Sequence, residues 1–364
     1  MIGLYIHVPF CASKCPYCNF YSFRANKKQK DAYFSAILDE IRKRGGKKRA
    51  NTLYFGGGTP TLLESDKINK IVKYVAYYFG LGCDDEITIE ANPKTLSQKK
   101  LFELKKAGVN RLSIGVQSGL ESELKALGRK HNLRDVENAV RIAKSEGFEN
   151  ISVDIIIGAP GQTVETMFET LEFVETLDID HCSLYQLKIE PETPFGHNPP
   201  SNLASEDDVA TIYLAAIQRL KKMGFRQYEI SNFSKKFKQS KHNLKYWTME
   251  EYIGLGPGAH SFLDSKRFFH EPNFEKYISD VMYVRHEEVL NENFEWLMLG
   301  LRLAHGVSLL ELKRKGFWDK VFEAKTKKLQ DVGYAKLCGG RFCLTPRGML
   351  VQNAILLNLC DNIN

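Results

Sequence analysis

Short β-rich apolar segments alternate with longer amphipathic segments through the first 225 of the 364 residues. The segments with strand character are residues 4–8, 52–55, 86–90, 111–115, 151–157 and 181–187. The segments with apolar residues at helical spacing are residues 28–44, 65–79, 97–107, 134–146, 164–177 and 206–223. This alternation predicts βαβ units and a parallel sheet, either an open doubly wound sheet or a partial barrel, which periodicity alone does not distinguish.

The organisation of the chain changes after Phe225. Residues 228–264 are rich in Gly, Asn, Ser and Lys with interleaved aromatic residues. A helical block begins near Asn293, and the tail then shows a helix, short strands at 335–337 and 341–344, and a helix starting near Arg347. We therefore predict three parts: a core at 1–225, a connecting segment at 226–285, and a small winged-helix-like C-terminal domain at 286–364.

The chain has no long uninterrupted apolar stretch, and its first residues lack the charged and apolar regions of a secretory signal. We therefore expect a cytoplasmic protein whose 8 cysteines are ligands or free thiols rather than disulfides. The formal charge of +7 fits a nucleic acid, an anionic lipid or an anionic ligand equally well, and a solvated lysine surface explains it too.

Three cysteines, Cys11, Cys15 and Cys18, lie close enough in sequence to converge on one metal site. Soft thiolates select zinc or an iron–sulfur cluster. A structural zinc site needs four ligands, and His7 could be the fourth. A cluster held by three cysteines instead leaves one iron without a protein ligand, which is the open position that a reactive metal site requires.

Other polar and glycine-rich positions follow the predicted strands. The glycine run 56–60 comes directly after the second strand, and the cysteine loop after the first. Glu90, Gln117 and Asp154 lie in or just beyond later strands, and Arg129 follows soon after the fourth. Because parallel α/β folds bind ligands at the carboxyl ends of their strands, these positions predict one site on that face.

The Cys-x-x-x-Cys-x-x-Cys spacing resembles the signature of the radical S-adenosylmethionine (SAM) superfamily. That resemblance implies that Cys11, Cys15 and Cys18 hold a 4Fe–4S cluster whose open iron chelates the amino and carboxylate groups of SAM. One electron from the cluster would then cleave the sulfonium and give a 5′-deoxyadenosyl radical. The protein would supply binding and orientation.

Further segments narrow the resemblance to the coproporphyrinogen dehydrogenase-like branch, which contains the HemN and HemW families. The matching segments are residues 5–11, 15–18, 56–60, 89–93, 113–118, 127–129 and 153–161. The resemblance implies a partial barrel of six βα units. It also implies that Tyr5, Gly57 and Glu90 contact the cluster-bound SAM, with Glu90 accepting from ribose hydroxyls. The residues implied to line the neighbouring SAM pocket are Tyr17, Gly58, Thr59, Gln117, Arg129 and Asp154.

Two features separate the chain from the oxidase members of that branch. Phe20 occupies the position, two residues after the third cluster cysteine, where the oxidases carry another cysteine. Residues 242–247 match the HNxxYW motif that is typical of the HemW family. Membership of that family implies haem binding and delivery to apo-haemoproteins, including respiratory enzymes.

The HNxxYW segment also suits haem on chemical grounds. A histidine can bind iron axially, and Tyr246 and Trp247 offer flat apolar surface. We predict a haem contact by His242, with another histidine as the alternative ligand, and place His260 nearer the SAM pocket. The lysines that could pair with the propionates are Lys235, Lys236, Lys238, Lys241 and Lys245.

The leading interpretation is a haem chaperone that carries a 4Fe–4S cluster and SAM, with haem and an apo-haemoprotein as partners. Peripheral membrane association and a homodimer stay open, and no nucleic-acid partner is expected. The alternative is oxygen-independent coproporphyrinogen III oxidation, against which Phe20 argues, so enzymatic activity is left undecided. A third interpretation is a zinc-stabilised binding module without redox chemistry.

Overall fold

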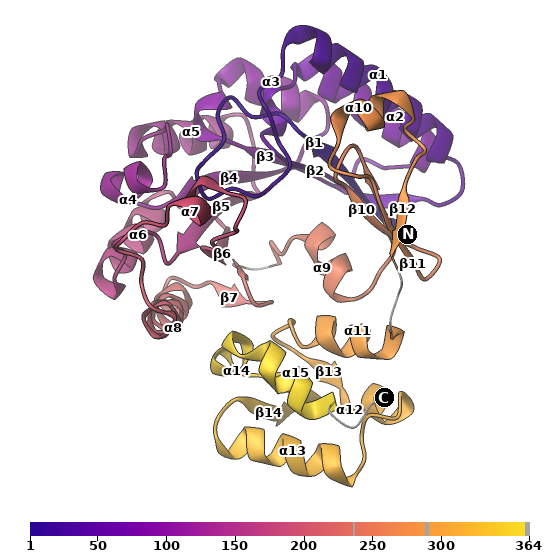
Figure 1. The fold of residues 1–364 in the computed structure, drawn as a ribbon. Coiled ribbons are helices and arrows are strands. Elements are labelled where there is room, and N and C mark those ends of the chain that lie inside the picture. The colour runs from indigo at the N-terminus through magenta and orange to yellow at the C-terminus, as the bar shows by residue number, and fades with distance from the viewer. Residues whose placement is uncertain (236, 288–290, 361–364) are drawn as a thin grey trace.

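The computed structural model describes residues 1–235, 237–287 and 291–360. Its main feature is a sheet of twelve strands in the order β12-β11-β10-β9-β1-β2-β3-β4-β5-β6-β8-β7, strongly curved around a concave face (Figure 1). Six strands run parallel in sequence order: β1 (Ile2–Val8), β2 (Ala50–Gly57), β3 (Glu86–Ala91), β4 (Arg111–Gln117), β5 (Ile151–Ile157) and β6 (His181–Gln186). All six predicted strands are thus present, and the sheet stays open, which confirms the partial-barrel expectation.

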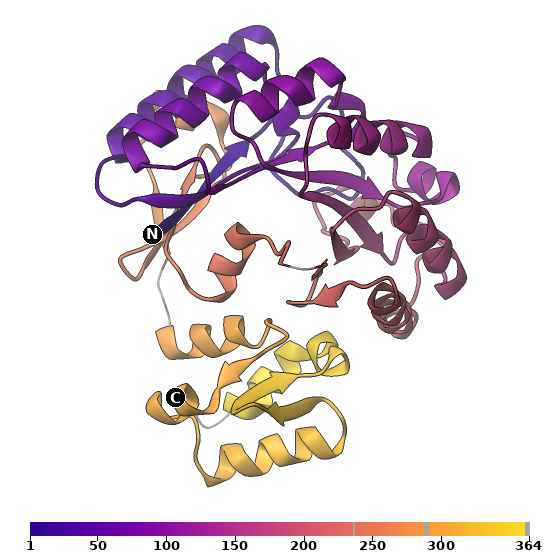
Figure 2. The same ribbon diagram turned by 180° about the vertical axis from the view of Figure 1, so that it is seen from behind.

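Helices cover the convex face of this sheet (Figure 2). The long ones are α1 (Lys27–Arg44), α2 (Ser65–Phe79), α3 (Gln98–Lys106), α5 (Leu133–Ser145), α6 (Val164–Thr176) and α8 (Glu206–Lys222), each within two residues of its predicted bounds at either end. Short turns of helix fill the connections: η1 (Pro60–Leu62), η2 (Pro93–Thr95), α4 (Glu121–Ala126) and α7 (Pro194–His197). Strand alternation explains the layers, because Leu4 and Ile6 are fully buried under helices while Tyr5 and His7 face the concavity.

Residues 226–287 extend the sheet at both edges, which the sequence did not predict. Strand β9 (Tyr252–Leu255) pairs parallel with β1, and β10 (His260–Leu263), β11 (Lys266–Phe269) and β12 (Arg285–Glu287) continue antiparallel. At the other edge, β8 (Asn232–Ser234) and β7 (Arg226–Gln227) follow β6. The main sheet therefore runs past the predicted boundary at residue 285.

Helix α9 (Lys241–Trp247) lies inside the curve of the sheet, near the starts of β1 and β2 (Figure 1). Its backbone is held there by Glu86 at the start of β3, whose carboxylate accepts from the amides of Lys241 and His242 at 3.0 Å each. Helix α10 (Phe274–Ser279) packs beside α1 on the outer side. Helix α9 thus covers the amino-terminal end of the concave face.

The C-terminal residues build a second hydrophobic core around Leu297, Leu312 and Phe342, all fully buried. The elements are α11 (Glu292–Gly300), β13 (Val307–Ser308), α12 (Leu309–Arg314), α13 (Lys320–Asp331), β14 (Ala335–Cys338), β15 (Arg341–Leu344), α14 (Pro346–Leu350) and α15 (Gln352–Cys360). The three strands form an antiparallel sheet in the order β13-β15-β14. Across the described part of the chain, no helix combines the length and the apolar character that a bilayer crossing requires.

Candidate functional site

The three cysteines lie in the long loop between β1 and α1. The base of this loop is closed by two backbone bonds, from Cys11 N to Phe23 O at 3.0 Å and from Phe23 N to Pro9 O at 2.9 Å. Phe10 is fully buried and packs edge-on against Phe23 at 5.6 Å between ring centroids. The three thiols stay half-buried, so the loop is fixed at its ends and open at its tip.

The glycine run after β2 packs directly under the cysteine loop. Gly58 N donates to Val8 O at 2.9 Å and Thr59 N to Phe10 O at 2.7 Å. A Cβ on Gly58 would stand 2.6 Å from Phe10 O, and Gly57 has a φ of +105° with the His7 ring 2.6 Å from its would-be Cβ. Glycine is therefore required for this close approach.

Arg129 and Tyr17 surround the middle cysteine. The buried guanidinium of Arg129 donates to Cys15 Sγ at 3.5 Å and to Gly115 O at 2.8 Å. Burial raises the pKa of the Tyr17 phenol, which also bonds with Cys15. The chain can bring Arg129 here because Gly128, with a φ of +68°, lies against Pro16 of the loop.

The donor set fits an iron–sulfur cluster better than zinc. His7 does not join the thiols, since its Nε2 lies 2.8 Å from Tyr21 O and its Nδ1 3.2 Å from Tyr5 Oη. Burial lowers the pKa of His7 and raises that of the Cys18 thiol, and the Arg129 guanidinium donates to Cys15 Sγ. Within the described ranges, no three His, Cys, Asp or Glu side chains form a ready-made metal cage.

Three thiolates of this loop would hold the cluster, and the family's SAM would bind at its open iron, beside the ends of β1 to β4. When bound, the cluster supplies one electron to the SAM sulfonium. The residues of the chain supply the surrounding hydrogen bonds and charge. Thr59 illustrates this, because its Oγ1 lies 3.6 Å from Cys11 Sγ.

Glu90 is the residue before the last of β3 and lies on the concave face. Its carboxylate accepts from Tyr54 Oη at 2.9 Å and from Gly57 N at 3.2 Å. Burial, and then the nearby Asp154 charge, raise the pKa of Glu90 to about 7. Glu90 thus lies beside the glycine run with a carboxyl group that titrates near neutral pH.

Asp154 lies on β5, two strands from Glu90. Ser113 Oγ lies 3.2 Å from each of its carboxylate oxygens, and burial raises the pKa of Asp154. Gln117 follows a bulge at the end of β4 and has a φ of +76°, which turns it off the regular strand path. If Gly115 carried a Cβ, Gln117 Nε2 would lie 2.9 Å from it and a terminal nitrogen of Arg129 would lie 3.4 Å from it. The bulge therefore brings the side chains of Gln117 and Arg129 to the same backbone position.

Tyr5 on β1 lies beside Tyr54 and Gly56 of β2. Its ring stacks on Tyr54 at 6.1 Å between centroids, and it would meet a Cβ on Gly56 at 2.8 Å. The sequence-predicted residues Tyr5, Gly57, Gly58, Thr59 and Glu90 therefore lie around the ends of β1 to β3.

Two further residues of the concave face were missed at the sequence level. Arg111 is 1% exposed and its charge acts on Glu90 and Asp154, yet no carboxylate of the described residues forms an ion pair with it. Tyr185 lies on β6 and is 42% exposed. Strand alternation could have found both residues. Arg111 and Tyr185 occupy alternate positions of β4 and β6 whose side chains point to the same face of the sheet as Asp154.

His242 does not lie on an exposed basic loop. It is 1% exposed within α9, with Nδ1 2.8 Å from Thr52 Oγ1 and Nε2 2.7 Å from Tyr246 Oη. Burial, and then the Lys245 and Arg111 charges, lower the pKa of His242 to about 3, so the imidazole is neutral. Iron ligation by His242 stays a prediction, and it would require one of these two bonds to open.

The predicted propionate lysines are scattered. Lys245 is 3% exposed and bonds with Glu250 at 2.6 Å, and Lys238 donates to Glu149 O at 3.0 Å. Lys235 lies over the Phe225 ring at 4.8 Å, and Lys241 is exposed. Lys236 lies outside the described residues. The described lysines therefore do not form one cluster beside His242.

His260 and Phe20 both have exposed side chains. His260 has a side chain that is 57% exposed, and its place near the SAM pocket stays a prediction. Phe20 is 68% exposed, so the oxidase cysteine position carries an apolar ring facing solvent.

The comparisons with known proteins identify the family. Residues 5–174 match the radical SAM superfamily model and residues 290–351 the HemN C-terminal domain model. The chain is 34% identical to the heme chaperone HemW of Bacillus subtilis, with 98% of each chain covered, and 33% identical to that of Escherichia coli, with 98% and 97% covered.

A vertebrate relative and a solved structure extend the comparison. The chain is 32% identical to the mitochondrial radical S-adenosyl methionine domain-containing protein 1 of Bos taurus, covering 99% of this chain and 88% of that one. Coproporphyrinogen III oxidase (HemN) from Escherichia coli superposes with a TM-score of 0.83 at 21% identity, covering 98% and 89%, which shows a shared fold. The full-length identity, the three-cysteine loop and the HNxxYW segment together place this chain in the HemW family of the radical SAM superfamily.

Proposed function

We propose that this protein binds haem and delivers it to an apo-haemoprotein, while holding a 4Fe–4S cluster and SAM at its carboxyl-end face. The observation that carries the proposal is the span of the similarity. Relatives described as heme chaperones match almost from end to end, including residues 226–287 and the C-terminal domain. Both regions lie beyond the radical SAM model match, so the likeness is not limited to the cofactor-binding core.

Phe20 supports the chaperone over the oxidase. Oxidation of coproporphyrinogen in this branch is tied to a cysteine at that position. A phenyl ring offers neither a thiol nor any other ionisable group. The shared fold with coproporphyrinogen III oxidase does not carry that activity to this chain, because 21% identity defines architecture only.

The test begins with anaerobic reconstitution of the full chain with iron and sulfide. Ferric haem b is then titrated in, and the loaded protein is mixed with an apo-cytochrome of the b type, followed by its absorption spectrum. We expect stable haem binding, then transfer. The matched control is the chain with Cys11, Cys15 and Cys18 changed to Ala, which separates haem binding from cluster loading. Conversion of coproporphyrinogen to protoporphyrinogen by the reconstituted protein would establish the oxidase instead.

Two finer statements belong to the same proposal. We propose that the protein is cytoplasmic and meets respiratory acceptors at the membrane surface, drawn by its formal charge of +7. Sedimentation with anionic and with neutral vesicles tests this, and equal binding to both would contradict it. We also propose a homodimer, which light scattering of the haem-loaded chain would detect.

A further inference from the structure

A groove lies between residues 246–267 and helix α11 of the C-terminal domain. It consists of two adjoining cavities of about 250 Å³ each, and Met249 and Phe262 line both. Together these cavities reach the size of ligand pockets, about 300–1,000 Å³. The groove is at the opposite end of the concave face from the cysteine loop, because Tyr246 and Trp247 of α9 form part of its wall.

The groove walls combine aromatic and charged side chains. Tyr246, Trp247, Tyr252 and Phe262 come from the barrel side, and Trp296 comes from α11. Flat apolar walls of this kind suit a flat apolar ligand. Trp247 Nε1 is buried and meets no acceptor among the residues that the structure describes, so the lining also holds an unpaired donor.

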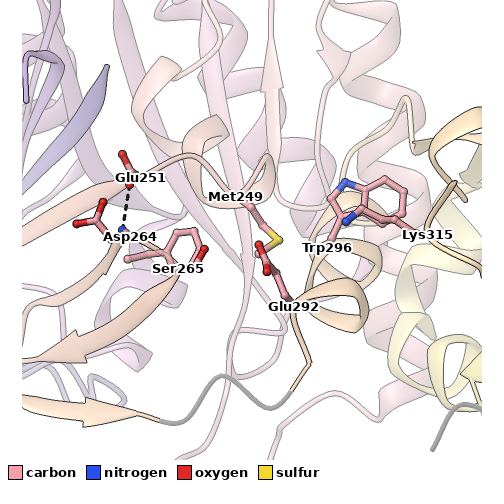
Figure 3. Close-up of a pocket in the computed structure, with 8 residues that line it drawn as sticks. Met249, Glu251, Asp264, Ser265, Glu292, Trp296 and Lys315 are labelled. Carbon is pink, nitrogen blue, oxygen red and sulfur yellow. Dashed lines mark hydrogen bonds between the residues drawn. The ribbon is translucent and has the colours of Figure 1, made fainter.

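Met249 occupies the centre of the groove in a strained backbone conformation. It follows α9 with a φ of +55°, a region that favours glycine and costs other residues about 1–2 kcal/mol. A methionine at a helix end where glycine is preferred points to a use for its side chain. Figure 3 shows the thioether directed into the space between Glu251 and Asp264 on one side and Trp296 and Lys315 on the other.

Charge within the groove is uneven. Glu251 and Asp264 are both bound by Lys48, at 2.6 and 2.7 Å. Lys315 donates to Asn293 at 2.8 Å and lies over the Trp296 ring at 5.1 Å, and no carboxylate of the described residues pairs with it. Glu292 lies on the same wall and opposes an anion there.

We propose that haem binds in this groove, with its iron facing the Met249 thioether and a propionate at Lys315. The proposal deepens the chaperone function and rests on it. Among the lining residues, the side chains of types that ligate haem iron are Met249, Tyr246 and Tyr252. Tyr246 Oη is bound to His242, and Tyr252 Oη accepts from Arg267 at 3.2 Å, which leaves the thioether.

In this arrangement His242 is a positioning residue. Its bond to Tyr246 holds the groove wall, and its own imidazole stays on the barrel side against Thr52. Changing His242 therefore weakens haem binding without changing the iron ligand. This distinguishes the proposal from direct ligation by His242.

The decisive experiment measures haem affinity and the visible spectrum of the full-length protein. Met249→Leu should weaken ferrous haem binding about tenfold and shift the absorption bands, because a soft thioether ligand is lost. Binding of iron-free protoporphyrin should not change. Met249→Gly should have the same effect on haem while leaving the melting temperature equal or higher, since glycine suits the backbone there. Met282→Leu, at a 39% exposed position outside the groove, is the matched control.

Further variants separate the possible failures. Lys315→Glu should weaken haem and protoporphyrin alike, and Glu292→Gln should strengthen both. His242→Gln should lower affinity severalfold with unchanged band positions. If His242→Gln changes the bands and Met249→Leu does not, haem binding stands and the Met249 site is wrong. If the unaltered protein binds no haem, the chaperone function itself fails.

Discussion

The guanidinium of Arg129 donates to Cys15 Sγ at 3.5 Å while its other terminal nitrogen donates to Gly115 O at 2.8 Å. Arg129 thereby connects the cysteine loop with the end of β4. Because the charge lies beside a thiolate ligand, we predict that Arg129→Met lowers cluster content after reconstitution, measured as iron and sulfide per chain. Arg141→Met, on the exposed side of α5, should reconstitute like the unaltered protein. Equal cluster content in the two variants would show that Arg129 has no such role.

SAM affinity should depend on the ionisation of Glu90. A ribose that donates to Glu90 requires the carboxylate, and burial raises the pKa of Glu90 to about 7. Below pH 7 the Glu90 carboxyl is protonated and must lose that proton before it can accept from the ribose. SAM affinity should therefore fall by up to about tenfold per pH unit as pH decreases from 7. Equilibrium dialysis between pH 6 and 8 measures this. Glu90→Gln removes this contribution, so an identical pH profile in the variant would contradict it.

The glycine at position 57 should be irreplaceable for steric reasons. Gly57→Ala places a Cβ against the His7 ring at a φ of +105°. Gly46→Ala provides the control, because Gly46 has a φ of +91° with nothing within 4 Å. Gly46→Ala should cost about 1–2 kcal/mol from backbone strain alone. Gly57→Ala should cost clearly more in urea unfolding and also lose SAM binding, and equal costs would refute the contact.

A buried carboxylate on α1 holds the loop between β9 and β10. Glu40 is fully buried and accepts from His270 Nε2 and Arg44 Nε at 2.7 Å, Tyr277 Oη at 2.9 Å and Gly256 N at 3.1 Å. Glu40→Leu should destabilise the fold by about 3–5 kcal/mol, because it leaves buried donors unpaired. Asp39→Leu, next to it but with exposed partners, should have a much smaller effect on the melting temperature.

Acid sensitivity should arise partly from His242. Its pKa is lowered to about 3 in the fold, against about 6.5 when unfolded. The unfolded chain therefore binds the extra proton between these values, and stability is lost as pH falls from about 6.5 towards 3. Melting temperatures of His242→Gln should fall less steeply with acid over this window than those of the unaltered chain. Parallel slopes would mean that His242 does not titrate on unfolding.

The sequence predicted the parallel strands and long helices because each has its own periodicity, as in α2, where Ile68, Ile71 and Val75 repeat at helical spacing and are fully buried. It also predicted the face of the site, since strand order fixes where the carboxyl ends lie. The additions to the sheet were missed because strands of two to four residues, such as β7 and β9, exist only by pairing with their neighbours.

The HNxxYW segment shows the same limit on the side-chain scale. The sequence predicted that its lysines pair with haem propionates, yet Lys245 is buried and pairs with Glu250. Local composition could not show that Glu86, far away in the chain, holds the amides of α9 inside the curve of the sheet. The groove between α9 and α11 depends on that placement, so it could be found only in three dimensions.

The pairing of β1 has a mechanical consequence. Strand β1 leads into the cysteine loop at its carboxyl end. On the side away from β2 it pairs with β9, whose Tyr252 lines the groove. One length of backbone therefore borders both the cysteine loop and the proposed haem groove. A displacement of β1 on cluster loading would reach that groove through the main-chain hydrogen bonds between β1 and β9, without a relay of side chains.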